Sequence, residues 1–491
     1  MAEAQHETQK KAVKAAKWAY VARYFPTATN LLAQIFLARL LMPSDYGIVG
    51  VCASVIAFTV IFQGGRGVGL AIIQAKEDSE ADYSNALTMN LLLGAFIYVL
   101  LIIFSPIICL YAKDPRIAPV LAIQGLSIIF TSYSSILIAR LQRNFGFRQI
   151  AFRMIPQSLV PLAVGVPLAY AGMNYWSLVI SSLVGDALSV LLLTIMVGWI
   201  PRVSWDLERF VRLFRFSKWL ILEDIIAWAI NNVDTFLIAR FLSMTDVGVY
   251  VFAKRIVTIG VGGIISPLSP IMYSAFCRLA DNPVHLRSAL LNVNKIVSIV
   301  SLPIIACIAV LAPAFVPAIF GAKWTGAGVI VTLHALSEIS YLATPGLQLY
   351  GALGKPWLNA IVMLSGGVST IIGFFIAIPY GLFWFVIARL IGLVFVLTPI
   401  SLIITISLLK VSILQFMVII RSSAVSATFI SLVLVMALRF YFSLSLTPFF
   451  ANALLFLFAI GSIGIYVLAL RIIDPHGFRS LLSMGKNVVG I

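Results

Sequence analysis

Long apolar runs recur from one end of the chain to the other, most of them about twenty residues or longer. A helix of that length crosses the hydrocarbon of a bilayer, so the runs predict transmembrane helices. The alternation of apolar and polar residues that a membrane β-barrel needs is absent. The composition agrees, because 61% of the 491 residues are hydrophobic and 11% are charged, against about half and about a quarter in soluble domains. We therefore expect an all-α integral membrane protein.

The hydrophobic pattern predicts about fourteen transmembrane helices. Their expected positions are residues 18–42, 48–72, 85–111, 117–141, 154–172, 175–198, 217–242, 248–275, 290–320, 327–353, 357–379, 381–408, 418–443 and 448–471. The loops between them are short, so any binding or chemistry has to take place among the helices.

Lysine and arginine residues are distributed unevenly between the two sets of loops. With a cytoplasmic N-terminus, the inner segments hold the basic clusters at residues 10–17, 140–153 and 202–218, whereas the opposite loops carry few cations. The inner loop at 74–84 is acidic, but acidic residues count little in the positive-inside rule. The asymmetry predicts a multi-pass protein with both termini in the cytoplasm. It also accounts for the net charge of +16 without a nucleic-acid partner.

One phrase occurs twice, as FLARLLMPSDYG at residues 36–47 and as LIARFLSMTDVG at residues 237–248. Six predicted spans separate equivalent points, so both copies run in the same direction through the membrane. Transporters built from such parallel repeats bind their substrate between the two halves. The alternative is a duplication that retains no function at the interface.

The repeat defines the expected domains. They are an N-lobe at residues 1–198 with spans 1 to 6, a linker at 199–216, a C-lobe at 217–409 with spans 7 to 12, and residues 410–491 with spans 13 and 14 and a cytoplasmic tail. Apolar and basic residues of the linker fall on opposite faces of a helix, which is typical of a helix lying on anionic lipid. A passive connector between the lobes is compatible with the same pattern.

The repeated phrase itself has the pattern of a helix start. Ser44 and Thr245 are the expected N-caps of the following helices, and Asp45 and Asp246 fall in the first turns. We therefore interpret the repeated segment as a structural element that starts the following helix.

A polar stripe precedes each copy of the phrase. Spacings of three or four residues place its members on one face of their helix. The first stripe is Arg23, Thr27, Asn30 and Gln34, and the second is Asp224, Trp228, Asn231 and Thr235. A polar face is costly against lipid, so we expect it to line a water-filled cavity, the alternative being packing against another helix. Asn30, Gln34 and Asn231 are the candidates for contacts with sugar hydroxyl groups.

Charged residues inside predicted spans mark either a transport pathway or paired structural sites. Arg23, Arg66, Lys254 and Arg255 are our candidates for binding phosphate, and Lys295 and Arg389 are further cations. The acids are Asp186, Glu223, Asp224, Asp234 and Glu338, of which Glu223, Asp224 and Asp234 are candidates for ion coupling. Salt bridging, such as Asp234 with Arg255, is the alternative for each residue. Cations outnumber acids modestly, which favours an anionic ligand.

Motifs of enzymes and cofactor proteins are missing. No phosphate-binding loop of the GxxxxGK[ST] type occurs, and the four histidines show no metal-ligand spacing. We expect no cofactor, no metal ion and no catalytic residue.

Several segments resemble one known family. ARLLMPSDYGIVG, ARFLSMTDVGVYVFAKRI, RLQRNFGFRQIAFR and PIMYSAFCRLADNPVHLR are similar to sequences of the polysaccharide transporter family, which includes the Wzx-type flippases. That family belongs to the multidrug, oligosaccharidyl-lipid and polysaccharide exporter superfamily, and the likeness is to its exopolysaccharide-export branch.

The resemblance implies a fold of two six-helix lobes, with two further helices in some members. It also implies a bacterial inner-membrane flippase that exports a polyprenyl-pyrophosphate-linked oligosaccharide, with membrane lipids and the polysaccharide polymerase and chain-length machinery as partners. One alternative is a multidrug and toxin extrusion exporter of the same architecture. The alternative of another class is a membrane glycan-assembly enzyme or a non-transporting assembly factor.

Overall fold

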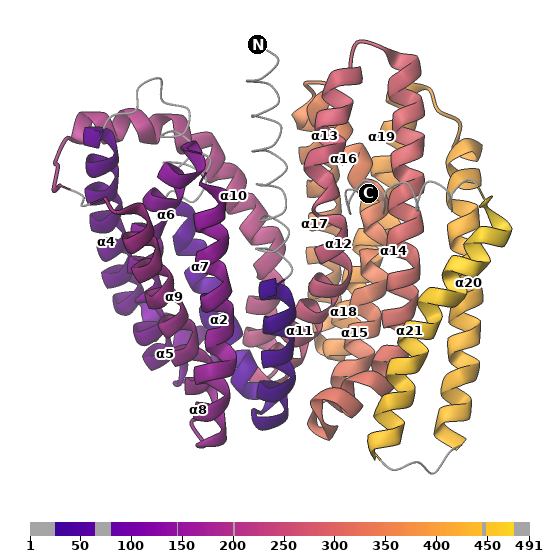
Figure 1. The fold of residues 1–491 in the computed structure, drawn as a ribbon, viewed down its shortest axis with the longest axis horizontal. Helices are drawn as coiled ribbons and strands as arrows, with labels where there is room; N and C mark the ends of the chain where they lie inside the picture. Colours follow the sequence, from indigo (N-terminus) through magenta and orange to yellow (C-terminus); the bar gives the residue numbers. More distant parts are fainter. Residues whose placement is uncertain (1–24, 64–79, 145, 200–201, 444–447, 476–491) are drawn as a thin grey trace. The chain divides into compact units, whose positions relative to one another are not determined.

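The computed structural model describes residues 25–63, 80–144, 146–199, 202–443 and 448–475, and all its secondary structure in these ranges is helical (Figure 1). The chain forms two compact units, Met1–Gly248 and Val249–Ile491. The boundary between the units falls inside α11 (Met244–Val257).

The first unit contains nine helices among its described residues besides the start of α11. They are the helix over residues 25–40, α2 (Pro43–Val60), α4 (Glu80–Ala112), α5 (Ile117–Gln124), α6 (Ser127–Arg143), α7 (Phe147–Val160), α8 (Val166–Tyr170), α9 (Tyr175–Val197) and α10 (Leu207–Phe241). The short segments η1 (Ile61–Gln63) and η2 (Pro161–Gly165) extend α2 and α7 with 3₁₀ and π geometry.

The second unit continues α11 through the π-helical segment η3 (Thr258–Gly262). Its other helices are α12 (Gly263–Ile265), α13 (Leu268–Leu279), α14 (Pro283–Phe320), α15 (Thr325–Ser337), α16 (Thr344–Ala352), α17 (Pro356–Ala377), α18 (Leu382–Leu390), α19 (Thr398–Leu409), α20 (Ile413–Ser443) and α21 (Pro448–Ile473). Shorter helical turns connect them, namely η4 (Ala322–Trp324), η5 (Glu338–Ala343), η6 (Ile378–Tyr380) and η7 (Ile391–Leu397).

Within the described ranges, 12 helical segments are long and apolar enough to cross a membrane. The predicted spans at 18–42 and 217–242 coincide with two further helices, the one over residues 25–40 and α10. The prediction of an all-α integral membrane protein is therefore confirmed.

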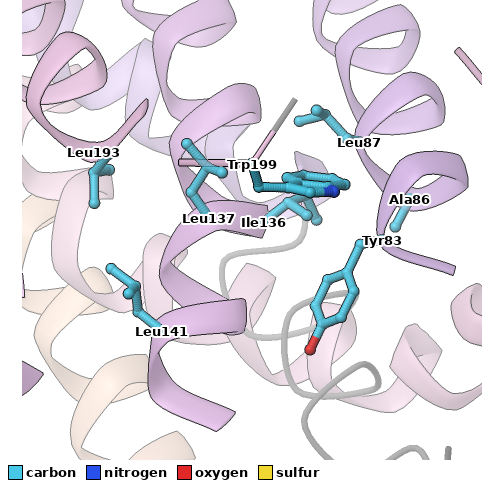
Figure 2. Close-up of a cluster of buried hydrophobic side chains, with 8 residues drawn as sticks. All are labelled: Tyr83, Ala86, Leu87, Ile136, Leu137, Leu141, Leu193 and Trp199. Atoms are coloured by element: carbon cyan, nitrogen blue, oxygen red, sulfur yellow. The ribbon is translucent and has the colours of Figure 1, made fainter. Parts of the chain in front are cut away.

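Apolar side chains of α4, α6 and α9 form the core at one end of the first unit (Figure 2). Tyr83 and Leu87 of α4 and Leu137 of α6 are almost fully buried there, together with Trp199, which follows α9. Arg140 lies over the Trp199 ring, with its guanidinium carbon 4.8 Å from the ring centroid. The charge of Arg140 is neutralised by the carboxylate of Glu80 at 2.8 Å.

The segment that leads into α10 is tied to α4 by hydrogen bonds. Asn85, which is fully buried, accepts a bond from the backbone N–H of Asp206 and donates one to its carbonyl oxygen, both at 2.9 Å. The backbone N–H of Ser204 donates to the Thr88 hydroxyl at 3.2 Å. Helix α10 then runs without a break from Leu207 to Phe241, so part of the predicted linker and the predicted seventh span form one helix of 35 residues.

The turn between α4 and α5 is closed by an ion pair. The Arg116 side chain donates to Asp114 at 2.7 Å and 3.0 Å, and the Arg116 backbone N–H donates to the same carboxylate. Burial raises the pKa of Asp114, but the hydrogen bonds from Arg116 outweigh this and leave the pKa below its ordinary value. Asp114 is therefore held in its charged form at the end of the span.

The first copy of the repeated phrase begins α2 at Pro43, with Met42 as N-cap. The carboxylate of Asp45 accepts a hydrogen bond from the Met42 backbone N–H at 2.8 Å. The predicted N-cap, Ser44, is therefore wrong by two residues, because proline fits the first helical position and an acid at the third position reaches back to the cap.

The second copy uses the same position for its cap. Asp246 accepts bonds from the Ser243 hydroxyl at 2.6 Å and from the Ser243 backbone N–H at 3.1 Å, and its own backbone N–H donates to the Ser243 hydroxyl. This reciprocal pattern is a capping box, and Thr245 is not the cap. Both copies thus start a helix at equivalent residues, and both aspartates lie in the first turn as predicted.

The last glycine of each copy allows the two helix starts to touch. A methyl group on Gly47 would overlap the carbonyl oxygen of Met244, and one on Gly248 would overlap the carbonyl oxygen of Pro43. The backbones of α2 and of the first turn of α11 are therefore in direct contact. Small residues permit such close helix crossings in membranes.

Helix α14 packs against the two C-terminal helices of the second unit, α20 and α21. The Tyr466 hydroxyl of α21 donates to the Ile299 carbonyl oxygen at 2.7 Å. Lys295 of α14 forms an ion pair of 2.6 Å with Asp474, which also accepts a bond from Ser422 of α20. This intramembrane lysine is thus paired within the unit.

The close crossing predicts that Gly47→Ala destabilises the protein. The added methyl group has to displace backbone, which costs about 1–3 kcal/mol. Thermal unfolding in detergent measures the effect. Gly461→Ala in α21 is the control, because the added carbon would have no atom of another described segment within 4 Å. Equal melting temperatures for the two variants would contradict the crossing.

The tether to α10 predicts that Asn85→Ala lowers the free energy of unfolding by about 1–3 kcal/mol, because two buried backbone groups lose their partners. The same unfolding assay applies. Thr428→Ala, which removes an exposed hydroxyl bonded within its own helix, should have little effect. A tether that contributes nothing would leave Asn85→Ala at the stability of the native protein.

Candidate functional site

The first polar stripe is only partly described, because Arg23 lies outside the described residues, as does Arg66 of the second predicted span. Asn30 is half-buried in the helix over residues 25–40. Gln34, one turn further on, is 3% exposed, and neither atom of its amide has a hydrogen-bond partner in the described part of the chain. Gln34 is therefore an unsatisfied buried polar group.

The second stripe is divided between packing and exposure. The indole N–H of Trp228 donates to the Ser54 carbonyl oxygen at 2.9 Å, and its ring centroid lies 4.7 Å from that of Phe58. Trp228 thus packs on α2. Asn231 is exposed and donates to the Ala227 carbonyl oxygen of its own helix, whereas Thr235 is buried.

The three acids proposed for ion coupling lie on α10. Asp234 is 1% exposed and accepts bonds from the Thr235 backbone N–H at 2.7 Å and from the Thr235 hydroxyl at 3.3 Å. Asp224 is half-buried. The side chain of Glu223 is outside what the structure describes.

Lys254 and Arg255 belong to the second unit and differ in their surroundings. Lys254 is half-buried, and its ammonium nitrogen lies 5.8 Å from the centroid of the Tyr250 ring. Arg255 is exposed. Consecutive residues of a helix point in directions about 100° apart, so these two cations do not share a face.

His334 of α15 lies against the same tyrosine. It is 1% exposed, and its ring centroid is 4.8 Å from that of Tyr250. Its Nε2 atom has no hydrogen-bond partner among the described residues. Lys254 and Arg389 both act electrostatically on the His334 ring.

Glu338 follows His334 by one helical turn. The same two cations, Lys254 of α11 and Arg389 of α18, act on its carboxylate. Lys254, His334, Glu338 and Arg389 therefore form one group, which we call the charge cluster. Lys254, Glu338 and Arg389 are half-buried, whereas His334 is enclosed.

The helices that carry the charge cluster depart from α geometry beside it. The 3₁₀ segment η5 begins at Glu338, the π-helical segment η7 begins two residues after Arg389, and η3 follows α11. Segments η3 and η5 touch, since a carbon added to Gly262 would lie 2.9 Å from the Tyr341 hydroxyl. Irregular helix geometry at membrane depth is typical of binding sites.

The cluster lies well inside the spans. At 1.5 Å per residue, Lys254 is about 15 Å from the start of α11, Glu338 about 20 Å from the start of α15 and Arg389 about 10 Å from the start of α18. The hydrocarbon of a bilayer is about 30 Å thick, so none of these charges is at an end of its candidate membrane span. The charge cluster holds two cations, Lys254 and Arg389, and one acid, Glu338, which favours an anionic ligand. Within the described residues no group of three or more His, Cys, Asp or Glu side chains is arranged to hold a metal ion.

Sequence reasoning found part of this cluster. Lys254 is a predicted phosphate ligand, and Arg389 and Glu338 are predicted intramembrane charges, whereas His334 is not among the predicted site residues. The spacing of four residues between His334 and Glu338, which places them on one helical face, was the available signal.

A family model described as polysaccharide biosynthesis protein matches residues 36–328. The chain belongs to this family. It is 24% identical to the lipopolysaccharide biosynthesis protein WzxC of Escherichia coli (strain K12), over 69% of this chain and 68% of that protein. It is also 24% identical to the succinoglycan biosynthesis transport protein ExoT of Rhizobium meliloti (strain 1021), over 71% and 76% of the two chains.

Two solved structures share the fold. The lipid II flippase MurJ in its inward closed conformation superposes with a TM-score of 0.72 at 15% identity, over 94% of this chain and 99% of that one. An inward-facing multidrug resistance MATE family transporter superposes with a TM-score of 0.62 at 16% identity, over 80% and 99%. The resemblance to the Wzx-type family is thus confirmed, and the chain is a multi-pass membrane transport protein of polysaccharide biosynthesis rather than an enzyme.

The unsatisfied amide of Gln34 predicts that Gln34→Leu stabilises the protein, or leaves its stability unchanged, because the substitution removes a desolvation cost of about 1–3 kcal/mol. Thermal unfolding measures stability, and complementation of a deletion strain measures transport. Loss of transport in a stable variant identifies Gln34 as a cavity residue. A large loss of stability would instead mean that the amide is satisfied in the folded protein.

Proposed function

We propose that the protein is a flippase for a polyprenyl-pyrophosphate-linked oligosaccharide repeat unit, the precursor of an exopolysaccharide or lipopolysaccharide. It moves this unit from the inner to the outer leaflet of the bacterial cytoplasmic membrane by alternating access. The names of the relatives support a role in exporting surface glycans.

The proposed architecture is a pair of pseudosymmetric six-helix lobes at residues 1–198 and 217–409, joined by the linker at 199–216. Residues 410–491 add two helices and a tail, and both termini are cytoplasmic. The repeated phrase supports this arrangement, because its two copies cap equivalent helix starts and present equivalent glycines.

The charge cluster is the observation that carries the proposal. A pyrophosphate cannot cross hydrocarbon without partners that replace its water. Lys254 and Arg389 supply two cations at membrane depth that act electrostatically on Glu338, and a guanidinium or ammonium group binds phosphate through charge-assisted hydrogen bonds. Outward movement of an anion is also favoured by the membrane potential, by about 2.3 kcal/mol per charge per 100 mV.

The remaining predicted residues keep their proposed roles. Arg23, Arg66 and Arg255 join Lys254 in binding phosphate, and Asn30, Gln34 and Asn231 meet sugar hydroxyl groups. Glu223, Asp224 and Asp234 are the acids proposed for ion coupling. The polysaccharide polymerase and its chain-length machinery are the proposed protein partners.

A multidrug and toxin extrusion exporter is the second candidate, because the fold is similar to that of a MATE family transporter. Such an exporter for cations would require an acidic binding site. The excess of cations over acids in the charge cluster disfavours it. Drug-efflux assays in a sensitive strain separate the two functions.

We expect deletion of the gene to abolish surface polysaccharide while lipid-linked oligosaccharide accumulates inside. Reintroduced Lys254→Gln should fail to restore export, because the cluster loses one of its two cations. Lys355→Gln, which changes an exposed lysine before α17, is the matched control and should restore export fully. Normal polysaccharide in the deletion strain would reject the proposed function.

A further inference from the structure

We propose that a groove between α17 and α18 binds one acyl chain of a zwitterionic phospholipid. The groove lies on the surface of the second unit, and none of the charge-cluster residues lines it. This lipid site goes beyond the proposed function, because it does not depend on which substrate the protein carries. The bound phospholipid is a resident ligand, unlike the lipids that exchange around the protein.

The groove is a cavity of about 350 Å³ between two helices that are joined by the short turn η6. The helices approach closely at its base, since a carbon added to Gly373 of α17 would lie 3.0 Å from Cβ of Ala388 of α18. Its lining combines small residues with large exposed ones. The small residues include Gly373, Ala388 and Gly392, and the large ones include Ile376, Trp384 and Ile391. The cavity is therefore a trough with a floor of small side chains and walls of large ones.

The groove has the length of one leaflet. Helices α17 and α18 belong to two candidate membrane spans, and the turn between them marks the end of both. The lining extends from Tyr380 at this turn to Ser369 within α17, which is about 16 Å of helix. The hydrocarbon of a bilayer is about 30 Å thick, so one leaflet accounts for about half of it. The groove thus matches one acyl chain that runs from headgroup level to the middle of the bilayer.

The surroundings of the groove indicate that hydrocarbon fills it. Its lining is mostly aliphatic and aromatic, and an apolar cavity does not hold water. Residues beside the lining also expose large apolar side chains, namely Ile372 and Phe375 of α17 and Phe395 of η7. A continuous apolar surface on membrane-spanning helices faces lipid chains. The groove is part of this surface, so a lipid chain is its natural occupant.

Two aromatic residues at the mouth provide contacts for a headgroup. Tyr380 is 71% exposed and Trp384 is 51% exposed, and within the described part of the chain neither side chain makes a hydrogen bond. Tyrosine and tryptophan at the ends of spans lie at headgroup level, where their O–H and N–H groups can donate to lipid oxygens. Residues 376–384 contain no charged side chain. This favours a zwitterionic headgroup over a diphosphate, which requires cations.

The groove is preformed. Phe374 of α17 stacks on Phe385 of α18 with the ring centroids 3.8 Å apart, and both side chains are buried. This stack holds the two helices together away from the groove. The π-helical segment η7 begins at Ile391, which lines the groove, and π-helical turns are frequent at functional sites. A preformed site binds its ligand without the cost of ordering the protein.

The test is native mass spectrometry of the purified full-length protein in neutral detergent, titrated with phosphatidylethanolamine. We expect one phospholipid to bind more tightly than the others. Trp384→Ala removes a wall and a donor, and it should weaken binding of this lipid about tenfold. Ser369→Leu fills the inner end of the groove and should weaken binding as well. This second variant leaves the mouth intact, so it tests the site even if Trp384→Ala does not fold.

Each variant has a matched control on α17. Trp357 is 59% exposed and does not line the groove, so Trp357→Ala should leave the affinity unchanged. Val368 is exposed next to Ser369 but outside the lining, so Val368→Leu should also have no effect. Thermal unfolding gives a second readout, because a ligand that binds only the folded protein stabilises it. Phosphatidylethanolamine should raise the melting temperature of Trp357→Ala more than that of Trp384→Ala.

Three outcomes would overturn the assignment. The first is equal affinity for phosphatidylethanolamine in the native protein, Trp384→Ala and Ser369→Leu. The second is tighter binding of phosphatidylglycerol than of phosphatidylethanolamine, which would reject the zwitterionic headgroup. The third is that the two groove variants lose affinity for farnesyl phosphate but not for phosphatidylethanolamine, which would make the groove a site for an isoprenoid chain.

Discussion

The absence of water at membrane depth is the constraint on which the structure depends. Every charge placed there needs a partner supplied by the protein. Lys295 meets this need in the simplest way, through a direct ion pair with Asp474 that also joins α14 to the C-terminal region. The charge cluster is different, since Lys254 and Arg389 act electrostatically on Glu338 and no direct ion pair with it is seen among the described residues. The first arrangement is a direct ion pair, whereas the second is an electrostatic interaction among several groups.

That contrast separates scaffold from site. In the scaffold, polar groups have hydrogen-bond partners: the Asn85 amide bonds to the backbone of Asp206, and the Tyr466 hydroxyl bonds to α14. Glycines allow α2 and α11 to cross in direct contact. The charge cluster combines a carboxylate near two cations, a His334 Nε2 that has no hydrogen-bond partner among the described residues, and irregular helix geometry. Binding sites in membrane transporters need this kind of incompleteness, because the ligand has to supply the missing partner.

Much of the helical arrangement could be predicted from the sequence, but the helix caps and the surroundings of the polar face could not. The helix starts at Pro43 and Met244 were expected close by, but the caps were assigned to Ser44 and Thr245 because hydroxyl residues cap most helices. In the structure, the carboxylates of Asp45 and Asp246 accept hydrogen bonds from backbone N–H groups three residues earlier, which makes Met42 and Ser243 the caps. The helical face of Trp228 was also predicted, but helical periodicity cannot tell whether a polar face meets water or the backbone of α2.

The sequence by itself determined the membrane class, the helices and the position of each intramembrane charge, because hydrophobicity and helical period are properties of local segments. The repeated phrase also identified two equivalent helix starts. Only the tertiary structure decided which charges lie near one another. Lys254, Glu338 and Arg389 come from three helices far apart in the chain, and His334 became significant only by its contact with Tyr250. Coulomb interactions depend on distance in space, which the order of residues does not specify.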